Sequence, residues 1–218
     1  MLQRFSNFIF LPIVLGLAYF LLSLFVFITF TRSLLTNELA GFDQLIINIV
    51  RSDLSPTLTG VMSVISFFGS PSFIIGAIIG GLVYCIFIKK VHWLAVQLLV
   101  ISASSWLLNK CLKDYFQRPR PLWPLAEAIG YSYPSGHAMV SISFYGFLIY
   151  LGLTKIIKPK LRLFVVAFLA ILILLIGISR IYLGVHYPSD VGAGFAAGGS
   201  WLVVCVLVLN ACQKKFSR

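Results

Sequence analysis

The chain has 218 residues, of which 60% are hydrophobic and only 11% are charged, and its mean hydropathy is +1.00. A soluble domain carries about a quarter charged residues, so this composition excludes a soluble protein and predicts an all-α membrane helix bundle of one domain, residues 1–218. The formal net charge of +11 would suit a nucleic-acid partner, but most basic residues flank apolar segments, as membrane orientation signals do. We therefore expect no nucleic-acid partner.

Six apolar segments approach or exceed the roughly 20 residues that a helix needs to cross a bilayer. They are residues 8–30, 71–88, 92–112, 136–154, 161–179 and 189–211. The first is longer than the core of a signal peptide and lacks a small-x-small cleavage site, so we expect it to remain as the first span. The sequence thus predicts six transmembrane spans.

An extra amphipathic or dipping helix is predicted before the second span. Residues 31–56 alternate apolar side chains such as Phe42 with polar ones such as Asp43, which is typical of a helix on the membrane surface. The apolar stretch that follows is too long for one straight span, and Gly-Ser-Pro interrupts it. We therefore predict a short dipping helix over 57–68, followed by the second span.

The basic residues predict the orientation. Six spans place the following basic residues on one side of the membrane: Arg4, Lys89, Lys90, Lys155, Lys158, Lys160, Arg162, Lys214, Lys215 and Arg218. By the positive-inside rule, that side is cytoplasmic and holds both termini. The membrane is expected to be the plasma (inner) membrane. Segments 31–56, 113–135 and 180–188 then face the opposite side. These segments also carry basic residues, against this trend, which suggests that those charges have another task.

A charged stretch, residues 179–190, lies between the last two spans. A proline favours the first turn of a helix, so Pro188 places His186 just before a helix and Asp190 in its first turn. A carboxylate that accepts one imidazole N–H turns the other nitrogen outward as a base or nucleophile. The alternative is a hydrated interfacial loop in which Arg180 extends to the headgroups.

Two further stretches would share the same side of the membrane. Lys113 and Arg120 follow the third span, and Ser135, Gly136 and His137 open the fourth. Lysine, arginine and a helix N-terminus suit a phosphate dianion and stabilise phosphoryl transfer. Two histidines then divide the chemistry, one attacking phosphorus and one protonating the departing oxygen, and the residues leave open which does which. No carboxylate cluster for magnesium and no P-loop is present, so we expect no metal and no cofactor.

Three ordered motifs carry a resemblance to a known family. They are K-x6-R-P from Lys113 to Pro121, PSGH from Pro134 to His137, and S-R-x5-H-x3-D over 179–190. They resemble the motifs of the type 2 phosphatidic acid phosphatase superfamily, whose members include lipid phosphate phosphatases, bacterial phosphatidylglycerophosphate and undecaprenyl pyrophosphate phosphatases, glucose-6-phosphatase and soluble haloperoxidases. The motif core spans 113–190.

Together with the orientation and the lack of a metal site, the resemblance implies a metal-independent lipid phosphatase with an extracytoplasmic site. It implies that His186 forms a phosphohistidine, that Asp190 orients it, and that His137 is the general acid. The implied phosphate-binding residues are Lys113, Arg120, Ser135, Gly136 and Arg180. A phosphatidylglycerophosphate-type lipid is the first expectation for the substrate, with undecaprenyl pyrophosphate or phosphatidic acid as alternatives. A non-enzymatic lipid-binding or lipid-transporting protein on the same fold is the other function class, and the sequence does not indicate an oligomeric state.

The remaining polar and aromatic residues receive structural interpretations. His92 is expected at the membrane interface, and Lys110 and Arg118 are expected to extend toward headgroups. The aromatic residues at the membrane interface are expected to form an aromatic belt, with the lining of a lipid entry as the alternative: Tyr115, Phe116, Trp123, Tyr131 and Tyr133. Close helix packing is expected of Gly76, Gly80, Gly192, Gly194, Gly198 and Gly199. Cys85, Cys111, Cys205 and Cys212 are expected to pack without forming a disulfide or a metal site.

Overall fold

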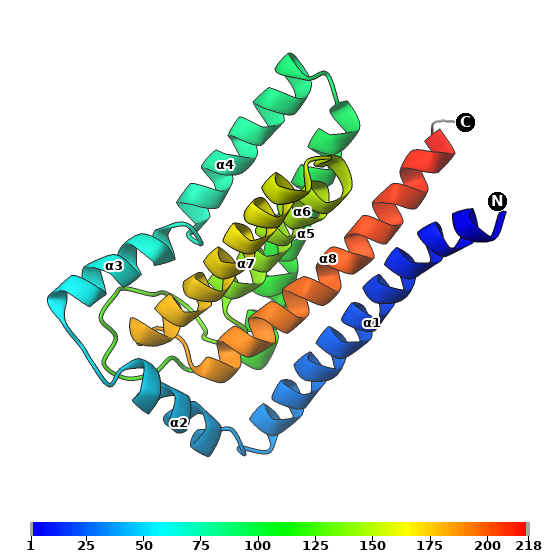
Figure 1. The fold of residues 1–218 in the computed structure, drawn as a ribbon. Coiled ribbons are helices and arrows are strands. Elements are labelled where there is room, and N and C mark those ends of the chain that lie inside the picture. The colour runs from blue at the N-terminus through cyan, green and yellow to red at the C-terminus, as the bar shows by residue number, and fades with distance from the viewer. Residues whose placement is uncertain (1, 217–218) are drawn as a thin grey trace.

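The structure, a computed structural model, describes the backbone of residues 2–216 and the side chains of residues 14–215. Arg218 and the side chain of Arg4, both part of the orientation argument, lie outside this range. Within it the chain is helical and has no β-strand. The elements are α1 (Leu2–Leu35), α2 (Ala40–Val50), α3 (Pro56–Phe67), α4 (Pro71–Val83), the π-helical turn η1 (Tyr84–Ile88), α5 (His92–Phe116), α6 (Gly136–Lys155), α7 (Pro159–Tyr182) and α8 (Pro188–Phe216) (Figure 1).

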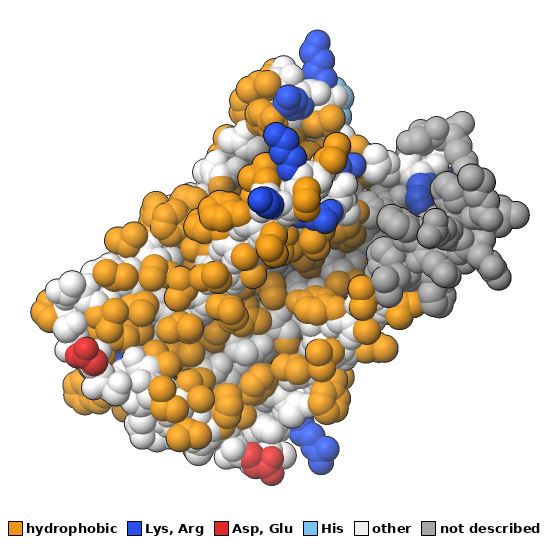
Figure 2. Space-filling model, in the orientation of Figure 1, with side chains coloured by type: hydrophobic (Ala, Val, Ile, Leu, Met, Phe, Trp, Pro, Cys, Tyr) orange, Lys and Arg blue, Asp and Glu red, His pale blue; other side chains and the backbone are white. Residues whose placement is uncertain are grey.

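Six helical segments are long and apolar enough to cross a membrane. They are Val14–Leu35, Pro56–Ile88, His92–Phe116, Gly136–Lys155, Pro159–Tyr182 and Pro188–Lys215. Figure 2 shows that apolar side chains cover much of the flank of the bundle. Such a flank is stable against lipid, and helices satisfy their own backbone hydrogen bonds there. The predicted six-span helix bundle is therefore confirmed.

The segment before the second span is organised differently from the prediction of one surface helix over 31–56. Residues 31–35 continue α1, and the separate amphipathic helix is α2, whose Phe42, Leu45 and Ile49 are exposed. The predicted dipping helix is α3. The α3 and α4 helices each begin with a Ser-Pro pair, in which the serine hydroxyl caps the first turn and proline occupies the first helical position.

The centre of the bundle is the contact between α6 and α8. The α1 helix packs on α8, and α5 and α7 pack on α6 (Figure 1). A Cβ atom at Gly194 would lie 2.7 Å from the Ser135 carbonyl oxygen, and one at Gly198 would collide with the Met139 carbonyl oxygen. Because only glycine lacks that atom, these two positions bring the backbones of α6 and α8 into direct contact.

The other glycine predictions have mixed outcomes. A Cβ at Gly192 would collide with the ring of Phe30, and one at Gly199 would collide with the Tyr19 hydroxyl, so both glycines let α1 approach α8 as expected. Gly76 and Gly80 on α4 have no other atom within 4 Å of a Cβ built there, so the packing prediction is wrong for them. The α4 helix stands at the edge of the bundle (Figure 1), and both glycines are exposed.

The two ends of the bundle differ in charge. Lys and Arg gather at the end that carries the η1–α5 and α6–α7 connections (Figure 2). The opposite end carries α2, the loop 117–135 and the turn between α7 and α8. All six acidic residues of the chain belong to that second end: Glu38, Asp43, Asp53, Asp114, Glu127 and Asp190.

Candidate active site

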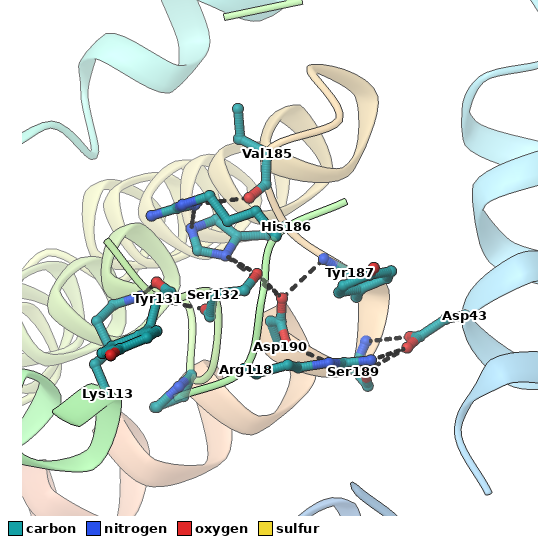
Figure 3. A network of polar contacts seen from close by, with 12 residues as sticks. Asp43, Lys113, Arg118, Tyr131, Ser132, Val185, His186, Tyr187, Ser189 and Asp190 are labelled. Carbon is teal, nitrogen blue, oxygen red and sulfur yellow. Dashed lines mark hydrogen bonds and ion pairs between the residues drawn. The ribbon is translucent and has the colours of Figure 1, made fainter. Parts of the chain in front are cut away.

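The predicted site residues come together at the acidic end of the bundle. They are Lys113 in the last turn of α5, Arg120 in the loop 117–135, Ser135, Gly136 and His137 at the start of α6, Arg180 in the last turns of α7, and His186 and Asp190 around the start of α8. The loop and four helix ends thus surround one small region (Figure 3).

The start of α8 fixes the His186–Asp190 pair. Pro188 is the first helical residue, and its missing N–H is not needed there. The Asp190 Oδ2 atom accepts the Tyr187 N–H at 2.9 Å, so this carboxylate caps its own helix from the third position, as the acidic residue of a capping box does. The preceding turn includes Gly184 at φ 68°, a conformation that favours glycine.

The Nδ1 side of His186 is held by two groups (Figure 3). The ring is 2% exposed, and its Nδ1 atom lies 3.2 Å from Ser132 Oγ and 3.5 Å from Asp190 Oδ2. The Ser132 hydroxyl donates to that same carboxylate oxygen. Ser132 therefore bridges the pair, accepting from Nδ1–H and donating to the carboxylate. This arrangement favours the tautomer in which Nε2 carries the free lone pair.

The Nε2 side of His186 faces a cation. The Arg120 Nη1 atom lies 3.3 Å from Nε2, while the other contacts of that guanidinium are backbone carbonyls of the loop 117–135 and Val185. Burial lowers the pKa of His186 to about 4, although Asp190 opposes part of that shift. The imidazole is therefore neutral at pH 7, as a nitrogen nucleophile must be.

Two more cations approach from neighbouring helices. Lys113 Nζ donates to the Tyr131 carbonyl at 2.5 Å and to the Ser132 carbonyl at 3.2 Å. Arg180 Nη1 donates to the Ser66 hydroxyl on α3 at 2.5 Å. The dipping helix therefore helps to place one of the predicted phosphate-binding residues.

The start of α6 presents donors that have no partner within the described part of the chain. The Ser135 hydroxyl is buried and unpaired, and so is the Nε atom of Arg180. The first N–H groups of α6 add to them, because a helix cannot satisfy these internally. A buried unpaired polar group costs about 1–3 kcal/mol, and an anion bound against this helix start would satisfy several at once.

His137 differs from His186 in its surroundings. It lies half-buried in the first turn of α6, and among the described residues no hydrogen bond holds its ring. Its electrostatic neighbours are Arg180, His186, Arg120 and Lys113. The imidazole is therefore close to the same region and free to donate or accept a proton there.

The prediction for Arg118 is wrong. Its side chain is 12% exposed and does not extend to headgroups, because it forms ion pairs with Asp190 at 2.6 Å and with Asp43 at 2.7 Å. The two carboxylates raise the pKa of Arg118, although burial alone would lower it. The only signal in the sequence was that Arg118-Pro119 repeats the pattern of Arg120-Pro121 two residues earlier.

The prediction for Tyr133 is also wrong. This residue is fully buried rather than in an aromatic belt, and its hydroxyl pairs with the Thr31 hydroxyl of α1 at 2.8 Å. Burial raises the pKa of Tyr133 to about 12, so the phenol stays protonated. Tyr115 and Trp123 are exposed, as a belt requires.

Sequence reasoning also missed Asp43 and Ser132. Asp43 appeared as one polar residue on a surface helix, yet it is 3% exposed and contacts the start of α8. Ser132 has no spacing signal relative to His186, and only the fold joins them. No group of three or more His, Cys, Asp or Glu side chains arranged to hold a metal ion occurs among the described residues.

Comparison with known proteins gives consistent matches. Residues 93–214 match the model of the PAP2 superfamily. A phosphatidylglycerophosphatase B from Bacillus subtilis (strain 168) is 33% identical over 181 residues, which cover 81% of this chain and 88% of that protein. An undecaprenyl-diphosphatase from Sulfolobus acidocaldarius is 27% identical over 194 residues, covering 84% and 86%.

A solved structure is similar over almost the whole bundle. The crystal structure of a transmembrane PAP2-type phosphatidylglycerolphosphate phosphatase from Bacillus subtilis has a TM-score of 0.74 and 28% sequence identity to this chain. The similarity covers 92% of this chain and 96% of that one. The six-helix arrangement is therefore that of an integral membrane protein.

Proposed function

This chain belongs to the PAP2 superfamily and is a membrane lipid phosphatase, and we propose that it removes the terminal phosphate of phosphatidylglycerophosphate through a phosphohistidine on His186. The observation that carries this mechanism is the environment of that ring. Its Nδ1 is fixed by Ser132 and Asp190, and its unprotonated Nε2 accepts from the Arg120 guanidinium.

In the first step, the Nε2 lone pair of His186 attacks phosphorus. An N–P bond forms, and the bond from phosphorus to the leaving lipid oxygen breaks. His137 supplies the proton that turns this oxygen into an alcohol. Asp190 stabilises the positive charge that develops on His186, because its carboxylate lies next to Nδ1.

In the second step, water attacks the phosphohistidine. His137 accepts the water proton as the new P–O bond forms, and the N–P bond breaks. The products are inorganic phosphate and the neutral His186 with which the cycle began. Each histidine therefore returns to its starting state.

The phosphate-binding roles fall to the groups around the start of α6. Lys113, Arg120 and Arg180 supply positive charge, and Ser135 and the Gly136 N–H supply neutral donors. The unpaired buried Ser135 hydroxyl and Arg180 Nε support this assignment, because phosphate oxygens would satisfy both. Positioned cations and a helix start stabilise the charge that spreads over the three equatorial oxygens during transfer.

The substrate assignment follows from the relatives. Similarity to the phosphatidylglycerophosphatase B of Bacillus subtilis extends over most of both chains and is supported by a similar solved structure. Undecaprenyl diphosphate is the second candidate, because a protein named for that activity is similar over 84% of this chain.

A phosphate-release panel with purified protein tests this assignment. Phosphatidylglycerophosphate, undecaprenyl diphosphate and phosphatidic acid are compared in the same detergent micelles, with His186→Ala as the inactive control. We expect the highest kcat/KM with phosphatidylglycerophosphate. A higher value with undecaprenyl diphosphate would reassign the substrate, and no release from any of them would contradict the lipid phosphatase.

The site is proposed to face the extracytoplasmic side, with both termini in the cytoplasm. The support is the charge difference between the ends, since exposed lysines such as Lys89 and Lys158 gather opposite the site. In a chain whose four free cysteines are replaced, Glu127→Cys and Lys158→Cys should react with an impermeant thiol reagent from opposite sides. Reaction of both from one side would overturn this orientation.

A further inference from the structure

We propose that Asp43 on α2 and Arg118 in the loop 117–135 are positioning residues of the reaction, which hold Asp190 and the start of α8 so that His186 Nε2 is aimed at phosphorus. The inference rests on the proposed phosphohistidine mechanism. Neither residue touches the ring of His186 or occupies a fixed position of the three motifs, and both act through Asp190 (Figure 3).

The first support is how Arg118 divides its guanidinium. Its Nη1 atom donates to Asp190 Oδ1 at 2.6 Å and to Ser189 Oγ at 2.8 Å, and its Nη2 atom donates to Asp43 Oδ2 at 2.7 Å. Asp190 thus uses one carboxylate oxygen for Arg118 and the other for the Ser132–His186 side. The planar guanidinium therefore fixes the plane of the carboxylate that orients the histidine.

The second support is the cap that α8 receives from α2. The α8 helix has no capping side chain of its own for the Ser189 N–H, and Asp43 Oδ1 accepts that N–H at 2.8 Å. The other Asp43 oxygen accepts from the Ser189 hydroxyl at 2.8 Å. A carboxylate at a helix N-terminus stabilises it through hydrogen bonds and through the helix dipole.

The third support is burial. Asp43 is 3% exposed and Asp190 is 0% exposed, and the Arg118 guanidinium also lies over the Tyr187 ring at 4.0 Å. Buried carboxylates need a cation, and loss of Arg118 would remove the arginine that both of them share. Three bonds of the network hold Ser189 and one holds Asp190, two adjacent residues in the first turn of α8. That turn follows His186 directly.

The network also completes the charge of the site. Four cations, Lys113, Arg118, Arg120 and Arg180, stand against two carboxylates, Asp43 and Asp190, which leaves a formal charge of +2. This charge matches a phosphate dianion. Asp43 thus offsets the cation that Arg118 adds, and the remaining cations are left for substrate.

The experiment compares Asp43→Asn, Arg118→Lys and Arg118→Gln with wild type. Turnover of an aryl phosphate and of phosphatidylglycerophosphate is measured for each variant, after thermal unfolding has shown a folded protein. The matched control is Asp53→Asn, which removes the same charge from an exposed residue at the same end of the bundle. The control should keep wild-type kinetics.

Misplacing a catalytic group lowers kcat strongly but changes the affinity for substrate little. We therefore expect KM to stay within about threefold of wild type. The kcat should fall about 10-fold to 10²-fold for Asp43→Asn and Arg118→Lys, and more for Arg118→Gln. Because the two residues act in one network, the double variant Asp43→Asn/Arg118→Gln should lose less than the product of the single losses. If the double variant loses the full product of the two single losses, so that the changes in activation free energy simply add, the shared role is overturned.

A titration of His186 separates positioning from general destabilisation. The charged groups facing this ring are Asp190, Lys113 and Arg120, and its titration is followed by NMR in a background of His92→Asn and His137→Asn. Arg118→Gln should raise the His186 midpoint because Asp190 loses its cation. Asp43→Asn should lower that midpoint because Arg118 then pairs with Asp190 alone. Unchanged midpoints in both would overturn the inference.

The aryl phosphate keeps this inference separate from the proposed substrate. If wild type hydrolyses the aryl phosphate but none of the lipids, the lipid assignment fails and the Asp43–Arg118 comparison still proceeds. If Asp43→Asn and both Arg118 variants fold and turn over the aryl phosphate at the wild-type rate, the positioning role fails while the lipid phosphatase stands.

Discussion

The starts of α6 and α8 make an instructive comparison, because similar sequences have opposite surroundings. Each has a Pro-Ser pair beside a histidine: Pro134, Ser135 and His137 at α6, and His186, Pro188 and Ser189 at α8. At α8 the serine hydroxyl and the histidine are both held by other side chains. At α6 the serine hydroxyl has no partner among the described residues, and no hydrogen bond holds the histidine.

The difference indicates a division of work between the two helix starts. A nucleophile must be held in one tautomer and one direction, which the α8 start provides. A phosphate site must keep donors available for oxygens that arrive with the substrate, which the α6 start provides. The following experiments test this division, from the largest expected effect to the smallest.

Removal of His186 should have the largest effect. His186→Ala should abolish turnover of both lipid and aryl phosphates, since no leaving group compensates for a missing nucleophile. Rapid quenching with labelled substrate should trap a phosphorylated wild-type protein and no phosphorylated His186→Ala variant. If His186→Ala still forms the acid-labile phosphorylated protein, a residue other than His186 is the nucleophile.

Removal of the negative charge at Asp190 should come next. In Asp190→Asn the amide can hold the imidazole in the wrong tautomer, and a comparable change in a serine-protease triad lowers kcat about 10⁴-fold. We expect a loss on the order of 10³–10⁴ in kcat with the fold retained. Steady-state kinetics on the folded variant measure it, and wild-type turnover would show that Asp190 does not orient His186.

Removal of His137 should depend on the leaving group. An alkoxide departs poorly without a proton, so His137→Ala should lose about 10²–10⁴-fold with a lipid phosphate. A nitrophenolate leaves without help, so most of that loss should disappear with an aryl phosphate. The measurement is turnover of both histidine variants on both substrates. Rescue of His186→Ala instead would reverse the two roles.

The two serines give a direct test of the comparison. Ser135→Ala removes an unpaired hydroxyl proposed to bind phosphate, so it should weaken kcat/KM about 10-fold to 10²-fold with little change in thermal stability. Ser189→Ala removes a paired hydroxyl and should lower the unfolding temperature more than Ser135→Ala does. Thermal scans and kinetics on both variants check this contrast. Equal changes in kcat/KM and in unfolding temperature for the two variants would contradict the distinction between the helix starts.

Removal of divalent metal should have the smallest effect. The phosphate is proposed to be held by Lys113, Arg120 and Arg180, so extensive dialysis against a strong chelator should leave turnover nearly unchanged. Turnover is measured before and after dialysis, and again after magnesium is added. A full loss that magnesium restores would replace this mechanism with a metal-dependent one.

Most of the fold could be predicted because its signals are local. Apolar length indicates six spans, and the break at Gly69-Ser70-Pro71 correctly separates α3 from α4. The end of α1 and the bounds of α2 were harder to predict from the sequence, because the segment 31–56 is amphipathic throughout and continues with the same helical period. The lack of packing at Gly76 and Gly80 could not be predicted from the sequence, because the spacing of small residues does not show whether another helix lies against them.

The site was predictable where its residues lie in short motifs. His186 and Asp190 are four residues apart, and a proline fixes their register with the helix. Ser132, Asp43 and Arg118 lie 58, 147 and 72 positions from Asp190 (190 − 132, 190 − 43 and 190 − 118). Only the packing of α2 and the loop against α8 brings them together. Charge alone predicted an interfacial position for Arg118, because the sequence does not show two buried carboxylates nearby.

The backbone contact between α6 and α8 has a consequence for how the protein responds to its bilayer. Gly194 and Gly198 let these helices touch without intervening side chains, directly below the two helix starts. A bilayer of different thickness is accommodated by tilting of helices and by local deformation of lipid, at a cost of fractions of a kcal/mol per Å. Helices at the edge, such as α4, can take up that tilt. Because the starts of α6 and α8 are tied by two backbones in direct contact, we expect the spacing of His137 and His186 to change less with bilayer thickness than the tilt of α4 does.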